Sequence, residues 1–150
     1  IGFPIGLIID GEKGDTPAQA KAGTIRFHNN VLAGMDIIGS DANKVYDDVL
    51  YDAAQKAVID ASQKSYSNTF FFQEALNNKA YDDIAALALT DASNVGSPFM
   101  PSSTSPLLSL ASFSGETSAW LDKVSYVGAF NATDNWLEGW TNFDPQNAKY

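Results

Sequence analysis

Short apolar runs within the first 39 residues predict β-strands. The runs FPIGLIID and GTIRFHNNVLAG, residues 3–10 and 23–34, are short and rich in branched or aromatic side chains. Within the second run, Ile25, Phe27 and Asn29 alternate with Thr24, Arg26 and His28. This is the spacing of a strand with one buried face. The pattern predicts two strands joined by the polar loop DGEKGDTPAQAKA.

The two consecutive asparagines of HNNVLAG indicate a particular kind of turn. Asn tolerates left-handed backbone conformations, and its side chains can stack in ladders between successive levels of parallel strands. Turns of this kind are typical of parallel β-solenoids.

After residue 40, the spacing of the apolar residues changes to that of a helix. Over residues 41–64 the apolar side chains recur at helical spacing, at Val45, Val49, Ala53 and Ala57. Ser40 or Asp41 is suited to cap the start of such a helix. A second helix is predicted over residues 72–89, with one apolar side formed by Leu76, Ala80, Ile84, Leu87 and Ala88.

The Ser-, Pro- and Asn-rich residues 90–119 predict extended chain and turns that cover a core. We expect residues 1–150 to form a single domain.

Composition excludes several classes of function. The net charge is -9 and the chain has only one arginine, Arg26, so nucleic acid is not an expected partner. No cysteine is present, which excludes disulfides and thiol catalysis. The opening run IGFPIGLII is too short to cross a bilayer and lacks the positive start of a signal peptide. We therefore expect a buried strand there and no transmembrane segment. Because the chain begins with Ile1 and not Met, we expect an upstream segment that was either removed or is not part of this sequence.

The C-terminal half resembles the ends of a family of bacterial surface proteins. The segments SPLLSLASF, VSYVGAF and DNWLEGWTNFDPQNAKY occur in this order after AGTIRFHNNVLAG and ALTDASN. Family tails read roughly S-P-A-L-x-G-A-x-F, V-x-Y-x-G-A-F and W-x-x-G-W-T-N-F-D-P. These are right-handed parallel β-helix-like, secreted or surface-anchored lipoproteins of Bacteroidota-type bacteria. The match covers residues 23–34 and 89–150. The chain differs from the family at Val127, where the family has Arg. It also differs at residues 105–110, which read S-P-L-L-S-L where the family has S-P-A-L-x-G.

The resemblance implies a fold, a location and partners. The expected fold is mainly β with two helices: a partial right-handed parallel β-helix, or solenoid, with an aromatic C-terminal cap. Because family members are several times longer, the chain would be the C-terminal part of a longer β-helix protein. It would lie at the extracellular or outer-membrane surface. Its partners would be other protein chains of a surface complex or the remainder of its own precursor.

The aromatic tail permits two interpretations. The first is structural: Trp136, Trp140 and Phe143 seal the last coil of the solenoid, which would otherwise expose its interior. The second is a carbohydrate-binding or carbohydrate-cleaving module in which Trp120, Trp136 and Trp140 stack on sugar rings. The recurrence of the motif at the ends of proteins with different upstream regions favours the structural interpretation. Asp134 and Glu138 would then complement a helix start.

Acidic residues supply one candidate metal site. Asp10, Glu12 and Asp15 lie in a glycine-containing loop of the kind that can bind Ca²⁺. The loop lacks the full calcium-loop pattern and its distal Glu, so a solvated acidic turn is preferred and no cofactor is expected. The acid pairs Asp47-Asp48 and Asp82-Asp83 read as solvated helix faces, because adjacent acids on a helix point about 100° apart.

Catalysis has little support in the sequence. His28 is the only histidine, and no local motif supplies it with a nucleophile or an orienting acid. We expect it at an exposed strand position. Phosphate-binding and nucleotide-binding fingerprints do not occur in the sequence. The sequence thus favours a non-catalytic structural or binding protein, a subunit or fragment of a cell-surface assembly.

Overall fold

The computed structural model describes residues 1–43, 45, 65–90, 99–114, 119–139, 141–142 and 144–147, together with the backbone of 51–52 and 57–58. The chain divides into two compact units, Ile1–Asp82 and Asp83–Tyr150. Each unit is described by itself.

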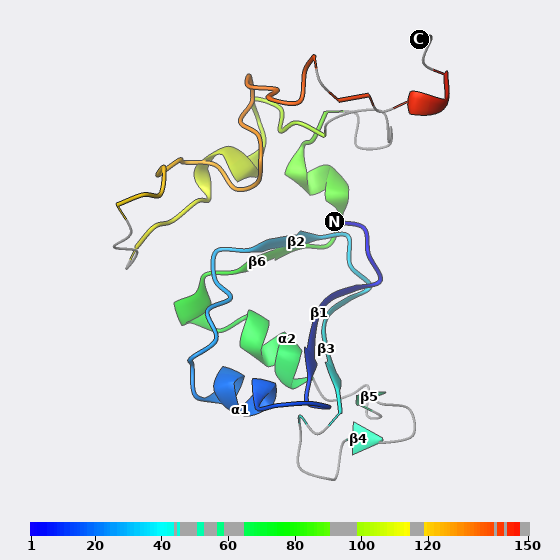
Figure 1. Ribbon diagram of the computed structural model, residues 1–150, viewed down its shortest axis with the longest axis vertical. Coiled ribbons are helices and arrows are strands. Elements are labelled where there is room, and N and C mark those ends of the chain that lie inside the picture. Colours follow the sequence, from blue (N-terminus) through cyan, green and yellow to red (C-terminus); the bar gives the residue numbers. More distant parts are fainter. Residues whose placement is uncertain are drawn as a thin grey trace. The chain divides into compact units, whose positions relative to one another are not determined.

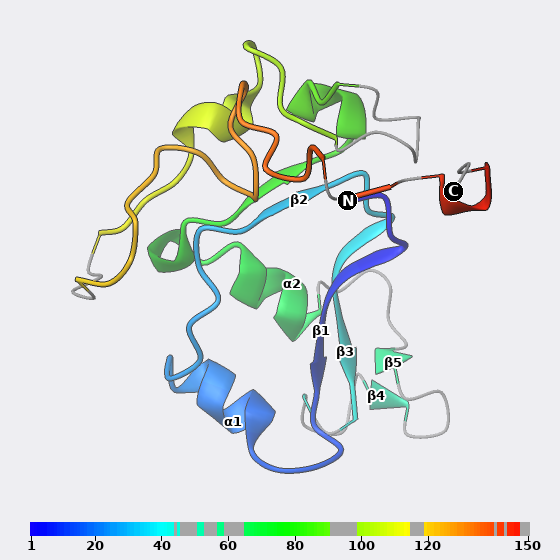
Figure 2. The same ribbon diagram turned by 45° about the horizontal axis from the view of Figure 1, so that its top comes forward.

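Two pairs of parallel strands organise the first unit. Strand β1 (Ile5–Asp10) pairs with β3 (Ile37–Ala42), with Ile5 opposite Ile37 and Ile9 opposite Asp41. Strand β2 (Val31–Ala33) pairs with β6 (Lys79–Tyr81). Figures 1 and 2 both show the members of each pair side by side. Two further strands, β4 (Tyr51–Asp52) and β5 (Ala57–Val58), form an antiparallel pair.

Two short helices lie in the connections between the parallel strands. Helix α1 (Thr16–Lys21) follows β1 and has Pro17 in its first turn, where a missing N–H costs nothing. Helix α2 (Tyr66–Phe71) begins after Ser65, whose hydroxyl accepts a hydrogen bond from the Asn68 N–H. A 3₁₀ turn, η1 (Glu74–Leu76), then leads into β6.

Helix α2 packs directly on β3 and provides the core of the first unit. The closest approach is at Gly39, where a Cβ atom would lie 2.4 Å from the Asn68 backbone nitrogen. Any larger residue there would push the helix away. The buried cluster consists of Ile9, Ala20, Val45 and Phe70, against which Leu7, Ile25, Phe27, Tyr66 and Leu76 pack.

Two pairs of asparagines connect the ends of the parallel strands. Asn29 and Asn77 both adopt left-handed backbone angles, with φ of 59° and 50°. The Asn77 side-chain amide donates to Asn29 Oδ1 at 2.9 Å, and the Asn30 amide donates to Asn78 Oδ1 at 3.1 Å. The predicted left-handed turn and side-chain ladder are therefore confirmed at these residues.

The second unit is built from turns and single hydrogen-bonded crossings. The Ser105 hydroxyl donates to the Leu87 carbonyl, and the Val127 N–H donates to the Leu107 carbonyl at 2.8 Å. Leu89 and Pro101 form an isolated bridge. The helical turns of this unit are η2 (Ile84–Leu87), η3 (Pro106–Ser109) and η4 (Pro145–Asn147). This agrees with the extended chain and turns expected over residues 90–119, as far as that range is described.

The expected partial β-helix with an aromatic cap is wrong. Across the residues that the structure describes, each parallel sheet has two strands and the remaining pair is antiparallel. A solenoid needs about three stacked repeats before its apolar faces cover one another. Here helix α2 covers β3 instead. The protein is a small mixed α/β structure with two small parallel two-stranded sheets and two short helices in its described part.

Both long helices predicted from periodicity are also wrong where they can be compared. The described parts of residues 41–64 contain the end of β3, β4 and β5, with Asn43 and Val45 in irregular chain, and the remainder lies outside the described residues. Residues 72–89 form η1, β6 and η2 in place of one helix. The apolar spacing misled because pairing with β2, far away in sequence, fixes Lys79–Tyr81 as a strand.

The first forty residues follow the sequence pattern in part. Strand β1 lies where it was predicted, but the second predicted strand is limited to β2, and residues 24–30 are irregular. The polar loop after β1 contains α1, which the pattern did not predict. Within the described ranges, no helix combines the length and hydrophobicity needed to cross a bilayer.

Candidate binding surfaces

A buried carboxylate fixes the start of helix α2. Asp41 is 1% exposed. The N–H groups of Tyr66 and Ser67 donate to its two oxygens at 2.7 and 2.8 Å, and the Ser67 hydroxyl donates to the same carboxylate. These are the unpaired N–H groups of a helix start, where a negative charge is favourable. Asp41 thus caps a helix, but α2 and not the predicted helix over 41–64.

The hydroxyl groups around Asp41 are fully occupied by structural contacts. Ser67 Oγ also accepts the Ile9 N–H at 3.1 Å, and the Ser65 hydroxyl donates to the Gly39 carbonyl. Ser67 is completely buried. A serine beside an aspartate resembles part of a catalytic arrangement, but a substrate cannot reach this hydroxyl. The hydrogen bonds of this cluster join β1, β3 and α2.

Tyr66 borders this cluster and titrates abnormally. Burial, followed by the nearby negative charge of Asp41, raises the pKa of the Tyr66 hydroxyl above its usual value. The Lys21 ammonium lies 5.6 Å from the centre of the Tyr66 ring and donates to the Val45 carbonyl at 2.9 Å. These contacts hold α1 against α2.

The acidic loop after β1 is held by hydrogen bonds of its own. Asp10 Oδ1 accepts the Glu12 N–H and the Asn43 side-chain amide, both at 2.7 Å. Asp15 precedes α1 without making a side-chain cap. In the described ranges, no group of three or more His, Cys, Asp or Glu residues is placed to hold a metal ion. Calcium binding by Asp10, Glu12 and Asp15 stays a prediction without geometric support.

The remaining sequence candidates lie apart from one another. His28 is partly buried in irregular chain, where its Nδ1 lies 2.8 Å from the Asn29 side-chain nitrogen, so the exposed strand position expected for it is wrong. Asp83 caps η2 by accepting the Ala85 N–H at 2.8 Å, and Asp82 is exposed. Asp47 and Asp48 lie outside the described residues.

Trp136 lies on the surface of the second unit. Its indole N–H donates to the Ala129 carbonyl at 2.9 Å, and its ring stacks on Phe130 with centroids 5.6 Å apart and planes inclined by 21°. The side chain is nevertheless 48% exposed. A capping role that keeps this ring from water is therefore wrong. Trp140 and Phe143 lie outside the described residues.

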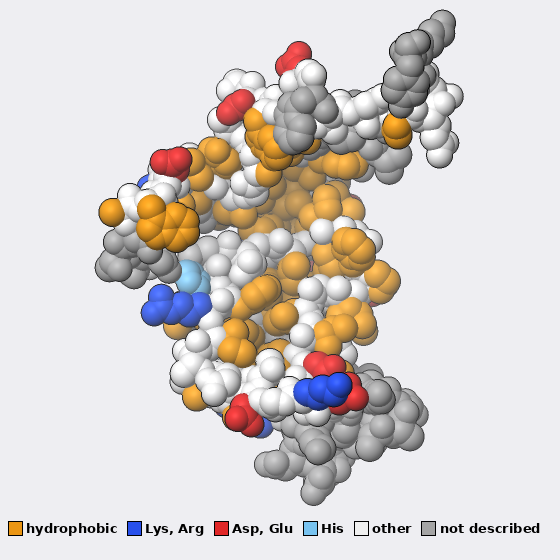
Figure 3. Space-filling view, in the orientation of Figure 1, with side chains coloured by type: hydrophobic (Ala, Val, Ile, Leu, Met, Phe, Trp, Pro, Cys, Tyr) orange, Lys and Arg blue, Asp and Glu red, His pale blue; other side chains and the backbone are white. Residues whose placement is uncertain are grey.

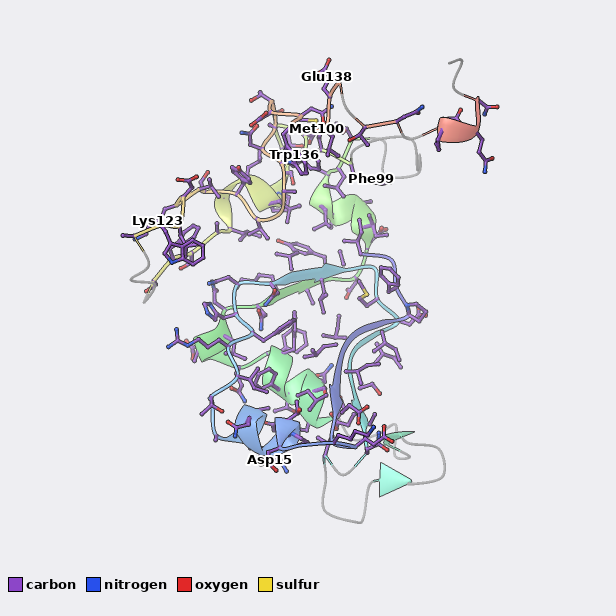
Figure 4. The ribbon with its side chains drawn as sticks, viewed as in Figure 1. Asp15, Phe99, Met100, Lys123, Trp136 and Glu138 are labelled. Atoms are coloured by element: carbon purple, nitrogen blue, oxygen red, sulfur yellow. The ribbon has the colours of Figure 1, made fainter. Side chains whose placement is uncertain are left out.

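Trp120 and Trp136, the two tryptophans that the structure describes, differ in how exposed they are and in the turn that surrounds them. Trp120 is 81% exposed. Trp136, in contrast, belongs to the segment 129–138, in which Asn131 Oδ1 accepts the N–H groups of Thr133 and Asp134 at 2.8 and 2.7 Å. The turn-forming residue is thus Asn131 and not Asp134. Asp134 and Glu138, two positions before and two positions after Trp136, are exposed. Figure 4 labels Trp136 and Glu138.

A second surface feature was missed in the sequence, where a buried strand was expected. Large apolar residues occupy every odd position at the start of the chain, and we call them the apolar row: Ile1, Phe3, Ile5, Leu7 and Ile9. Ile9 is 5% exposed within the core, but exposure reaches 36% at Ile5 and 68% at Phe3. Hydrophobic side chains are visible at the surface along this segment (Figure 3). The unusual density of apolar residues before β1 was the available signal.

The chain was compared with protein-family models, with curated proteins and with solved structures, and no match was found in any of the three. The resemblance to β-helix-like surface proteins therefore stays a prediction.

Proposed function

We propose that the chain is a non-catalytic structural subunit that associates with a second copy of itself through the apolar row. The observation that carries the proposal is the rise in exposure along that row, from the buried Ile9 to the exposed Phe3. The row continues beyond the part of β1 that the chain's own core covers. Exposed apolar surface of this kind typically marks a protein interface.

The pairing of β1 with β3 extends the apolar surface onto β3. Ile37 lies directly opposite Ile5 in the parallel pair and is 49% exposed. Residues opposite one another in a sheet present their side chains on the same face. Farther along the same face, Ile9 and Asp41 are covered by α2. On this face, only the beginning of the strand pair is therefore available to a partner.

The charge distribution favours a second copy over an anionic membrane. The chain carries a net charge of -9, yet positions 1–9 contain no charged side chain. An acidic chain is repelled by anionic lipid surfaces. Two copies can join their uncharged rows while their acidic residues remain in solvent. The same surface on both partners gives a self-complementary, two-fold interface.

Location at the extracellular or outer-membrane surface is part of the proposal and rests on the resemblance of the tail. It is tested by adding protease to intact cells that express the full-length protein. Digestion without cell lysis supports the location, and protection that disappears on lysis contradicts it.

The interface is tested by sedimentation velocity across a wide range of protein concentrations. The wild-type chain should change from monomer to dimer as its concentration rises. Phe3→Ser should weaken the dimer by about 4 kcal/mol, or roughly a thousandfold in Kd, because each of the two copies loses one large apolar side chain from the contact. Phe3 precedes β1 and is exposed, so the substitution leaves the fold intact.

Ile8→Ser is the matched control. Ile8 lies in the same strand and is 54% exposed, but it points to the face opposite Ile5. Its replacement should leave the dimer unchanged. A wild-type chain that stays monomeric at every concentration would overturn the proposal. So would an equal loss of association in Ile8→Ser and Phe3→Ser.

A further inference from the structure

The Trp136 side chain is held by a hydrogen bond and a stacking contact, although about half of it is exposed to solvent. The hydrogen bond from its indole nitrogen to the Ala129 carbonyl fixes the edge of the ring, and the stacked Phe130 ring supports it. Both supports come from residues six or seven positions earlier, so they close a loop. A side chain that is already ordered loses little entropy when it binds a ligand.

The backbone of this loop is ordered by its own hydrogen bonds. Asn131 Oδ1 accepts two N–H groups of the following turn, and the Glu138 N–H donates to the Asn135 carbonyl at 3.0 Å. Trp136 is therefore held from both sides along the chain. A large, flat and amphipathic ring in a fixed orientation is suited to recognition.

From this arrangement we infer that Trp136, backed by Phe130, is a binding site for the uncharged pyranose ring of a glycan. The C–H groups on one face of a pyranose pack against an indole, and its hydroxyl groups require acceptors at the edges. The exposed carboxylates of Asp134 and Glu138 lie two residues before and two residues after Trp136. Each can accept hydrogen bonds from hydroxyl groups.

Charge selects the class of sugar. Residues 83–150 contain seven acidic and two basic residues. Uronates and sulfated sugars would be repelled by this surface, and no arginine is present in the unit to compensate. A neutral glycan needs no such compensation. This inference is independent of association through the apolar row, which involves the other unit.

The direct test follows the tryptophan indole N–H resonances by NMR while cellohexaose or mannohexaose is added, with hexagalacturonate as the charged comparison. At least one neutral hexasaccharide should shift the Trp136 indole resonance in a saturable way, and hexagalacturonate should not. Trp136→Ala should weaken binding at least tenfold, measured by calorimetry, with an unchanged far-UV circular dichroism spectrum.

Two further variants guard against loss of structure. Trp136→Phe keeps a flat ring but loses the bond to Ala129, so it should bind more weakly than wild type and more tightly than Trp136→Ala. Trp120→Ala removes a more exposed indole from outside this loop and should bind like wild type. The inference is overturned if neither neutral hexasaccharide shifts Trp136 or if hexagalacturonate binds equally well. Equal loss of binding in Trp120→Ala and Trp136→Ala also overturns it.

Discussion

The contacts inside the first unit span longer distances in sequence than the side-chain turns inside the second unit do. Six of the buried apolar residues that the structure describes belong to the first unit, and Leu87 belongs to the second. In the first unit polar contacts join distant segments: Asp41 and Ser67 are 26 positions apart, and Asn30 and Asn78 are 48 positions apart. In the second, Asn131 and Asn142 bond to residues two or three positions away.

This difference indicates how each unit acquires its shape. The first unit is stabilised by contacts between segments that are distant in sequence. We therefore expect it to unfold cooperatively. The second unit combines a few hydrogen-bonded crossings, such as that from Val127 to Leu107, with local turns, which fix a loop such as 129–138 without a large core. A turn-rich surface of this kind is where binding residues are commonly placed.

The largest expected effect is at the centre of the first unit. Phe71 is fully buried, and Phe71→Ala should destabilise the first unit by about 3–5 kcal/mol. All three tryptophans lie after residue 119, so tryptophan fluorescence reports the second unit alone. In urea, the circular dichroism transition should move to lower concentration while the fluorescence transition stays. Equal shifts of both would show that the units unfold together.

Removal of the buried charge at α2 should have the next largest effect. Asp41→Asn replaces an acceptor with an amide that faces the N–H groups of Tyr66 and Ser67. We expect a loss of about 2–3 kcal/mol in the free energy of unfolding. The matched control, Asp10→Asn, changes an exposed residue whose bonded oxygen is retained, and it should cost below about 0.5 kcal/mol. Equal losses would contradict the capping role of Asp41.

The asparagines allow a direct comparison of long-range and local contacts. Asn78 donates to the carbonyls of Phe27 and Phe71 and accepts from Asn30. Asn78→Ala should therefore cost about 2 kcal/mol, because buried partners remain unpaired. Asn131→Ala removes a local cap and should cost about 1 kcal/mol. The first change should appear in circular dichroism and the second in tryptophan fluorescence. The reverse assignment would contradict the comparison.

The smallest effect concerns Tyr66. Because its pKa is raised in the folded state by burial and by Asp41, its stabilising contribution is complete below the unfolded value near 10. It should be lost as the pH rises through the folded pKa. Thermal unfolding should show Tm falling over this alkaline range in wild type and falling less in Tyr66→Phe. Identical slopes would show that the Tyr66 hydroxyl does not contribute.

The sequence predicted those features that depend on local pattern. The short apolar run before Asp10 predicted β1, and the paired asparagines of HNNVLAG predicted the left-handed turn at Asn29. Helix α1 was not predicted, although Pro17 in its first turn was an available signal of a helix start. The recurrence of Asn-Asn before both β2 and β6 was a further signal that these strands pair.

Features that depend on distant partners could not be read in this way. Residues 72–89 have helical spacing, but β6 forms because β2 lies beside it. Asp41 looked like the cap of the following residues, whereas its partners lie 25 and 26 positions later. For Trp136, composition identified an aromatic candidate but not its exposure, which depends on how the loop around Phe130 closes.

Amide hydrogen exchange at low and high protein concentration tests the proposed self-association most directly, because it locates the contact in the chain. Amides of residues 3–8 should exchange more slowly at high concentration, while those of residues 131–138 should exchange at the same rate in both samples. Exchange in residues 3–8 that is independent of concentration would contradict the proposed interface.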